Sequence, residues 1–134
     1  MANQFYGLGR DKFANAGINW TSDTIRAYLI DPAVYPVSIN TDEFLDDIAA
    51  GAKVAFAALT GNSSALGTCD ANDTVLPTVT GAICGAIVLA KWTGTEGTSA
   101  LIGYIDTATG LPITPNGGDI TLTWSDGANR IFTL

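Results

Sequence analysis

The 134-residue chain contains no histidine, and this absence removes much of the side-chain chemistry on which enzymes rely near neutral pH. Serine–histidine and cysteine–histidine nucleophile pairs cannot be built without it, so acid–base catalysis would fall to carboxylates. The chain also has only two cysteines, Cys69 and Cys84, which cannot complete a four-ligand zinc site by themselves. We therefore expect no enzyme activity, no metal site and no cofactor.

Charged residues are scarce as well. They make up 14% of the chain, against about 25% in typical soluble domains. Only six are Lys or Arg, and the net charge is −7. Nucleic-acid partners are not expected, because binding phosphate backbones requires clustered basic residues. A surface with so few charges is suited to being covered by neighbouring proteins, which favours a role in an assembly.

Long apolar runs are missing too. The longest is the nine-residue stretch 82–90, about half of the roughly 20 residues that a membrane-spanning helix requires, so no membrane association is expected. The stretch 82–92 does not alternate between apolar and polar residues, which predicts a strand buried on both faces. Small and apolar neighbours around Cys84 favour two buried thiols over a disulfide.

The residues that are present form a pattern of short strands. Residues 24–30 and 53–59 are rich in strand formers, and Ile120, Leu122 and Trp124 alternate with threonines. The Asp-Gly pair at 126–127 predicts a turn that pairs residues 119–124 with 130–134 in a C-terminal hairpin. About six to eight such strands, separated by Gly, Pro and Asn, predict a mainly β fold, an antiparallel, jelly-roll-like β-sandwich.

Two short helices are expected beside the strands. Residues 1–20 form a predicted N-terminal helical segment with Gly17 as its left-handed cap, and residues 21–134 form a single β-sandwich domain. The second helix begins at Thr41. The N-terminal segment is a candidate partner-binding arm, although it could equally be a helix that only covers the sandwich. Its candidate contact residues are basic and aromatic: Phe5, Tyr6, Arg10, Lys12 and Phe13.

Three other groups of residues have features of reactive or binding sites, but each has a simpler structural explanation. Paired carboxylates serve glycosidases, but the acidic residues in 42–47 are better explained by the dipole of the helix that they begin. Residues 70–73 start like a calcium loop and lack its glycine and closing glutamate, which favours a surface bend. Trp20, Trp92 and Trp124 could stack on sugars, but their strand positions favour core packing.

Three stretches, one near the start of the chain and two in its last third, carry a pattern that other proteins share. Residues 13–26 read FANAGINWTSDTIR, residues 101–112 read LIGYIDTATGLP, and residues 115–121 read PNGGDIT, followed by Ile131 and Phe132. With Tyr35, these stretches resemble a family of small proteins encoded among the structural genes of tailed bacteriophages. The resemblance implies a component of the virus particle, similar in size and composition to jelly-roll capsid cement proteins. It transfers no catalytic residue.

Composition and resemblance together lead to one expected function. We expect a phage capsid decoration (cement) protein that binds the outside of the major capsid protein lattice and stabilises the head. It would form a dimer or trimer, be assembled in the bacterial host cytoplasm and reside on the capsid surface of the virion. The alternatives are a virion protein of the tail, baseplate or fibre, or a carbohydrate-binding module that contacts the host.

Overall fold

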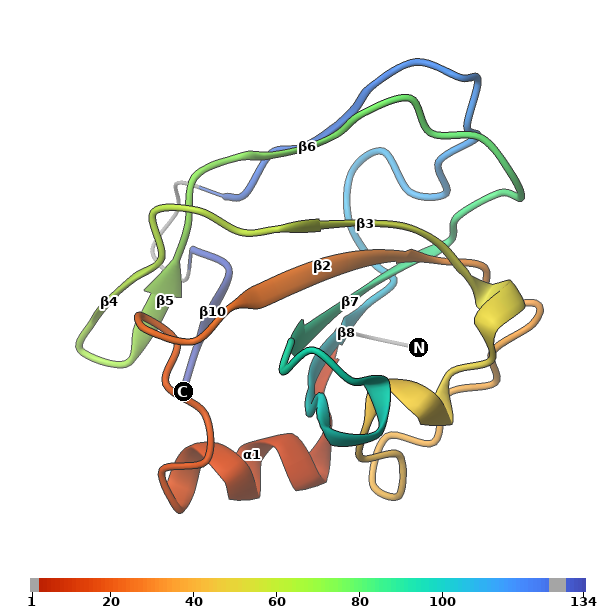
Figure 1. Ribbon diagram of the computed structural model, residues 1–134. Coiled ribbons are helices and arrows are strands. Elements are labelled where there is room, and N and C mark those ends of the chain that lie inside the picture. Colours follow the sequence, from red (N-terminus) through yellow and green to blue (C-terminus); the bar gives the residue numbers. More distant parts are fainter. Residues whose placement is uncertain (1–2, 126–129) are drawn as a thin grey trace.

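The computed structural model describes residues 3–125 and 130–134, and within these ranges its strands lie in three antiparallel sheets (Figure 1). The largest sheet has the strand order β1-β8-β7-β2-β3. Its strands are β1 (Gln4–Phe5), β8 (Leu101–Ile105), β7 (Ala86–Lys91), β2 (Ile25–Ile30) and β3 (Lys53–Ala58). The prediction of a mainly β, antiparallel protein is confirmed.

Two smaller sheets and one α-helix complete the fold. The strand order is β10-β5-β4 in one small sheet and β6-β9 in the other. Their strands are β4 (Ser63–Ala65), β5 (Thr68–Asp70), β6 (Thr74–Leu76), β9 (Ile120–Leu122) and β10 (Phe132–Thr133). Figure 1 shows helix α1 (Gly7–Ala14) at the bottom of the view and β6 at the top, with the five-stranded sheet between them.

The middle strands of the large sheet are buried on both faces. β7 pairs with β2 over six residues, from Ile25 opposite Lys91 to Ile30 opposite Ala86. Side chains of successive residues point to opposite faces of a sheet, so an unbroken apolar run needs a core on each side. The predicted doubly buried strand is confirmed for β7, while Cys84, just before it, makes an isolated bridge with Ile113.

Each face of the large sheet is covered by a different part of the chain. Leu29, Leu89 and Ile102 share one apolar cluster with residues of the small sheets, including Leu76 and Leu122. On the other face the cover is irregular chain and short 3-10 turns, η1 (Leu45–Asp47) and η2 (Ala50–Ala52). Buried there against Tyr28 and Val88 are Tyr35, Leu45, Ile48 and Ala52.

Several local predictions are corrected by the structure. The jelly-roll topology is not confirmed, because the described strands form separate sheets that do not close. The second helix is only the 3-10 turn η1. The left-handed residue after α1 is Ala16 (φ 66°) and not Gly17. The C-terminal hairpin is wrong, since Phe132 pairs with Cys69 and β9 pairs with β6; its predicted turn lies outside the described residues.

Candidate functional site: an arginine–aromatic cluster and an apolar cavity

The described part of the N-terminal segment is attached to the large sheet at Gln4, Tyr6 and Gly9. Gln4 pairs with Tyr104, and the side chain of Tyr6 is fully buried. Gly9 lies directly against β8, because a Cβ atom there would stand 3.3 Å from the Cα of Ile102 and even closer to the carbonyl oxygen of Leu101. The segment is therefore part of the domain's surface layer, and its binding to a partner stays a prediction.

The candidate contact residues of this segment face different surroundings. Phe5 and Phe13 pack against the core, where both rings lie near Phe132. Lys12 forms an ion pair with Glu43, with 2.6 Å between Nζ and Oε1. Arg10 is exposed on α1. The five residues therefore do not form one contact surface, since Tyr6 is in the opposite core cluster.

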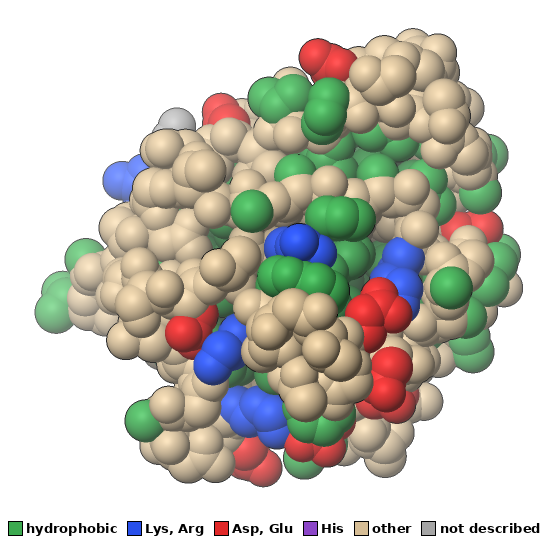
Figure 2. Space-filling view, viewed as in Figure 1, with side chains coloured by type: hydrophobic (Ala, Val, Ile, Leu, Met, Phe, Trp, Pro, Cys, Tyr) green, Lys and Arg blue, Asp and Glu red, His purple; other side chains and the backbone are tan. Residues whose placement is uncertain are grey.

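A cluster of aromatic side chains surrounds Arg26 on the face of the large sheet that also carries Tyr28 and Val88. The guanidinium carbon of Arg26 lies 3.9 Å from the ring centroid of Trp92 and 4.4 Å from that of Phe56. Figure 2 shows a basic side chain between hydrophobic ones near the middle of this face, over β2 and β3. We call Arg26, Tyr28, Phe56 and Trp92 the Arg26 cluster.

Strand pairing brings these four residues together. Tyr28 lies directly opposite Phe56 on β3, and Arg26 lies opposite Ala90 on β7. Trp92 follows Ala90 by two positions, and residues two apart along a strand share a face. The backbone N–H of Trp92 donates to the carbonyl oxygen of Thr24, which continues the pairing beyond the end of β7. A shallow pocket results, with Lys53 and Glu96 at its edge.

Arg26 and Arg10 differ from the other four basic residues, because neither forms an ion pair with a carboxylate among the described residues. Four ion pairs join basic residues to carboxylates among the described residues: Lys12–Glu43, Lys53–Glu96, Lys91–Asp23 and Arg130–Asp70. Arg26 has no carboxylate within ion-pair distance in the described part of the chain, and its guanidinium donates one long hydrogen bond, 3.5 Å, to the hydroxyl of Tyr28. The stacked guanidinium therefore keeps most of its N–H donors for an external acceptor.

The rings of the cluster are held by contacts of their own. Phe56 is 53% exposed, yet its ring lies 5.5 Å from that of Tyr28 as well as against Arg26. Burial raises the pKa of Tyr28 above its ordinary value, so its hydroxyl remains neutral over the physiological range. The cluster thus presents a cation held against two aromatic rings by cation–π attraction.

The tryptophans separate into two groups. Trp20 and Trp124 are buried, and each indole N–H donates a hydrogen bond, to the carbonyl oxygen of Asp70 and the hydroxyl of Thr74. The prediction of core packing is confirmed for these two. Trp92 is only half-buried: it packs against the core cluster that contains Tyr28, and its ring also lies over Arg26. The sequence did not predict this cluster. Its one local signal is an arginine within a strand of apolar residues, and the aromatic neighbours of that arginine are known only once β2 is paired with β7 and β3.

The acidic residues of the 42–47 segment are engaged in local structure. The Asp42 carboxylate accepts hydrogen bonds from the hydroxyl of Tyr35 and the backbone N–H of Ser38, at 2.6 and 2.9 Å. The Asp47 carboxylate accepts two from the backbone N–H groups of Glu43 and Phe44. Bound in this way, the carboxylates stabilise a turn, and the same Tyr35 hydroxyl contacts that of Tyr6 at 2.9 Å.

The two cysteines are not part of a reactive cluster in the described part of the chain. Cys69 and Cys84 are both buried free thiols, as predicted. Burial raises the pKa of Cys69 to about 11, which keeps the thiol protonated and unreactive. Across residues 3–125 and 130–134, no three His, Cys, Asp or Glu side chains gather closely enough to hold a metal ion.

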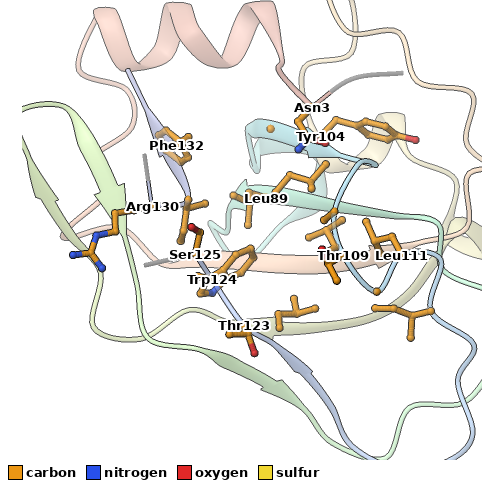
Figure 3. A pocket seen from close by; sticks show the side chains of 18 of the residues that line it. Asn3, Leu89, Tyr104, Thr109, Leu111, Thr123, Trp124, Ser125, Arg130 and Phe132 are labelled. Carbon is orange, nitrogen blue, oxygen red and sulfur yellow. The ribbon is translucent and has the colours of Figure 1, made fainter. Parts of the chain in front are cut away.

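A second feature is an apolar cavity of about 670 Å³, lined by residues of the large sheet, of the loop after β8 and of the ranges 120–125 and 130–132 (Figure 3). Leu89 belongs to its sheet-side wall, Leu111 to the loop after β8, and Trp124 and Phe132 to the opposite side. Its size falls in the range of about 300–1,000 Å³ that is usual for binding pockets.

Comparison with known proteins returned no match: no family model and no curated protein matches this chain. Within the described residues, no helix has the length and apolar character needed to cross a membrane.

Proposed function

We propose that the chain is a non-enzymatic structural protein of a tailed phage particle, a capsid decoration protein that docks on the major capsid protein lattice through the Arg26 cluster. The observation that carries this proposal is the partly buried guanidinium of Arg26, which is held between the rings of Phe56 and Trp92 without a carboxylate partner among the described residues.

The composition of the cluster supports a protein interface. Trp, Tyr and Arg are the residue types that most often carry the binding energy of such interfaces. A guanidinium held between two rings loses less conformational freedom on binding than a free one, because its position is already restricted. Its free N–H groups match the two oxygens of a carboxylate. We expect the partner to place an Asp or Glu side chain at Arg26.

Charge and resemblance support a place on the outside of a capsid. A net charge of −7 disfavours contact with a packaged genome and favours the outer surface. The likeness of residues 13–26 and 101–112 to structural proteins of tailed phages supports a particle component. A decoration protein acts by adding contact area across subunit seams, and attachment in many copies makes modest single contacts durable.

A second candidate function is a carbohydrate-binding module, which the partial exposure of Trp92 favours. Sugars stack on open aromatic faces. The ring of Phe56, however, already contacts Arg26 and Tyr28, and Trp92 contacts Arg26 on one face. The rings of the cluster are partly covered by Arg26, while the N–H donors of Arg26 remain available. A protein carboxylate is therefore the better-supported ligand.

The test is binding of the purified protein to shells that lack it, compared with an Arg26→Ala variant. We expect that variant to bind about 30-fold more weakly, as for truncation of a central interface residue, and Arg26→Lys to lose about tenfold because it keeps the charge without the planar fork. Arg10→Ala serves as the matched variant. If Arg26→Ala bound shells as tightly as wild type and Arg10→Ala lost binding, the docking site would lie on the N-terminal segment instead.

Copy number in purified particles tests the location independently of the site. A near-stoichiometric ratio to the major capsid protein, with stripped shells becoming heat-labile, supports the decoration role. Recovery of the protein only with isolated tails would assign it to the tail, and binding to host glycans in place of shells would favour the carbohydrate module.

A further inference from the structure

The shallow pocket of the Arg26 cluster also contains a carboxylate, that of Glu96. Glu96 begins the 3-10 turn η3 (Glu96–Thr98), in the loop between β7 and β8. Its side chain is 43% exposed, and its Oε2 atom lies 2.9 Å from Nζ of Lys53. Among the described residues, no hydrogen bond involves the second carboxylate oxygen, Oε1. The pocket therefore offers both a guanidinium with free donors and a carboxylate with a free acceptor.

Lys53 holds Glu96 from the inside of the protein. Its ammonium group has three N–H donors, and three acceptors surround it: the carboxylate of Glu96 and the carbonyl oxygens of Leu45 and Ile48, which lie 3.1 and 2.9 Å away. The lysine side chain is only 9% exposed. The positive end of this ion pair is thus buried and fully bonded, while its negative end faces solvent. A partner that approaches the pocket meets the carboxylate and not the ammonium group.

The loop that carries Trp92 and Glu96 is braced by its own hydroxyl groups. The hydroxyl of the fully buried Ser99 accepts from the backbone N–H of Thr93 at 3.1 Å and donates to the carbonyl oxygen of Thr95 at 2.7 Å. The same hydroxyl also lies 3.2 Å from that of Thr93. These bonds tie the two ends of the loop together, so the positions of the aromatic ring and the carboxylate are restricted before a partner binds.

The hydroxyl of Tyr28 lies within the influence of both charges. It accepts the 3.5 Å hydrogen bond from Arg26. Burial is the main reason that its pKa is raised; Arg26 acts in the opposite direction, and the carboxylate of Glu96 adds to the increase. Arg26 and Glu96 nevertheless form no ion pair with each other among the described residues. They are therefore neighbours in one pocket, and each is available to a different group of a ligand.

A second carboxylate strengthens the negative end of the pocket. A Cβ atom added at Gly97, the residue after Glu96, would stand 3.4 Å from Oδ2 of Asp46, which is exposed. Figure 2 shows acidic side chains next to a basic one, to the right of the hydrophobic side chains in the middle of the view. A cation is favoured at this end, because an anion would be repelled by both carboxylates.

We infer that the pocket binds a segment of the capsid partner that carries an acidic and a basic side chain close together, the acid at Arg26 and the base at Glu96. This binding mode rests on the proposed function and defines the partner chemistry that the docking site selects. A segment with two acids would place one of them against Glu96, and a segment with two bases would place one against Arg26. Either arrangement brings like charges together in a partly desolvated contact, and a neutral sugar gains neither ion pair.

Glu96→Gln tests the negative half of the pocket. The variant loses the charge but keeps an oxygen that accepts from Lys53, so its melting temperature should stay near that of wild type. Its binding to shells that lack the protein should fall about fivefold and should depend less on salt, because one ion pair across the interface is lost. Glu43→Gln is the matched control and should bind as wild type does, since Glu43 also pairs with a lysine, Lys12, and is 37% exposed, but lies outside the pocket.

Glu96→Lys extends the test, because it places a like charge against the base of the partner; binding should fall by at least about tenfold. If Glu96→Gln bound shells as tightly as wild type while Arg26→Ala bound weakly, the docking site would stand and the inferred base would be refuted. Tighter binding by Glu96→Gln, or an equal loss in Glu43→Gln, would refute it too. If Arg26→Ala also bound as wild type does, or if wild type did not bind shells, the proposed function itself would fail.

Discussion

Replacing Gly9 by alanine should destabilise the protein, although the same change in an exposed helix stabilises. Gly9 lies in α1 where the helix backbone touches β8. The added methyl group would meet the carbonyl oxygen of Leu101 and stand 3.3 Å from the Cα of Ile102. Both are backbone atoms of a central sheet strand and cannot rotate away. The helix must therefore move off the sheet, which also shifts the buried Tyr6 at its start.

The magnitude follows from two opposing effects. Overpacking in a well-packed contact costs about 1–3 kcal/mol, and the helix preference of alanine over glycine returns about 1 kcal/mol. Because the added methyl group meets backbone atoms, we place the overpacking cost in the upper part of that range, about 2–3 kcal/mol, which leaves a net loss of about 1–2 kcal/mol. A domain of this size loses about 3–5 °C per kcal/mol, so the melting temperature should fall by about 3–10 °C.

Urea and thermal denaturation of Gly9→Ala and Gly51→Ala measure this effect. Gly51 is the matched control, since the nearest atom to an added Cβ there is Cγ1 of Val34 at 4.0 Å and its φ is not positive. Gly51→Ala should be unchanged or more stable by about 0.4–1 kcal/mol. A Gly9→Ala variant as stable as wild type would mean that α1 does not rest on β8 and that residues 1–20 behave as a free arm.

Two further predictions concern the core. Burial raises the pKa of Cys69 from 9.0 to about 11, so the thiol ionises at lower pH in the unfolded chain than in the folded one. The contribution of this thiol to the free energy of unfolding is therefore complete below pH 9 and falls as the pH rises to 11. Urea midpoints measured between about pH 8 and 11 should decline, and the decline should be smaller in Cys69→Ala. A rising or flat profile would contradict this. Trp124→Phe should lower the free energy of unfolding by about 1–3 kcal/mol, because it leaves the buried hydroxyl of Thr74 without its hydrogen-bond donor. Trp92 is half-exposed, so Trp92→Phe should lower it by less than about 1 kcal/mol in the same denaturation assay. Equal losses in the two variants would contradict this prediction.

Strand-forming segments could be read from the sequence wherever one segment carries its own signal. The run that became β7 has apolar residues at every position but its last, and burial on both faces is the state that accommodates them. The strands at 25–30 and 53–58 likewise followed from local preference and bounding turns. The free state of the two cysteines was also evident, because their neighbours are small and apolar.

Pairings between distant segments could not be predicted from the sequence in this way. The C-terminal segment was predicted to fold back on residues 119–124, but Phe132 instead lies edge-on to the rings of Phe5 and Trp20, with centroids 4.9 and 5.0 Å away. Apolar packing in this aromatic group accompanies the pairing of Phe132 with Cys69, and no local pattern encodes which aromatic residues will meet.

By itself, the sequence determined the absence of histidine chemistry, the low charge, the mainly β class and the doubly buried central strand, since each depends on composition or on a single segment. Only the tertiary structure decided that Arg26 lies between Phe56 and Trp92, that α1 lies against β8 through Gly9, and that Arg26 and Glu96 line one pocket. These features join residues from strands far apart in the chain, and the choice of strand partners is a property of the whole core.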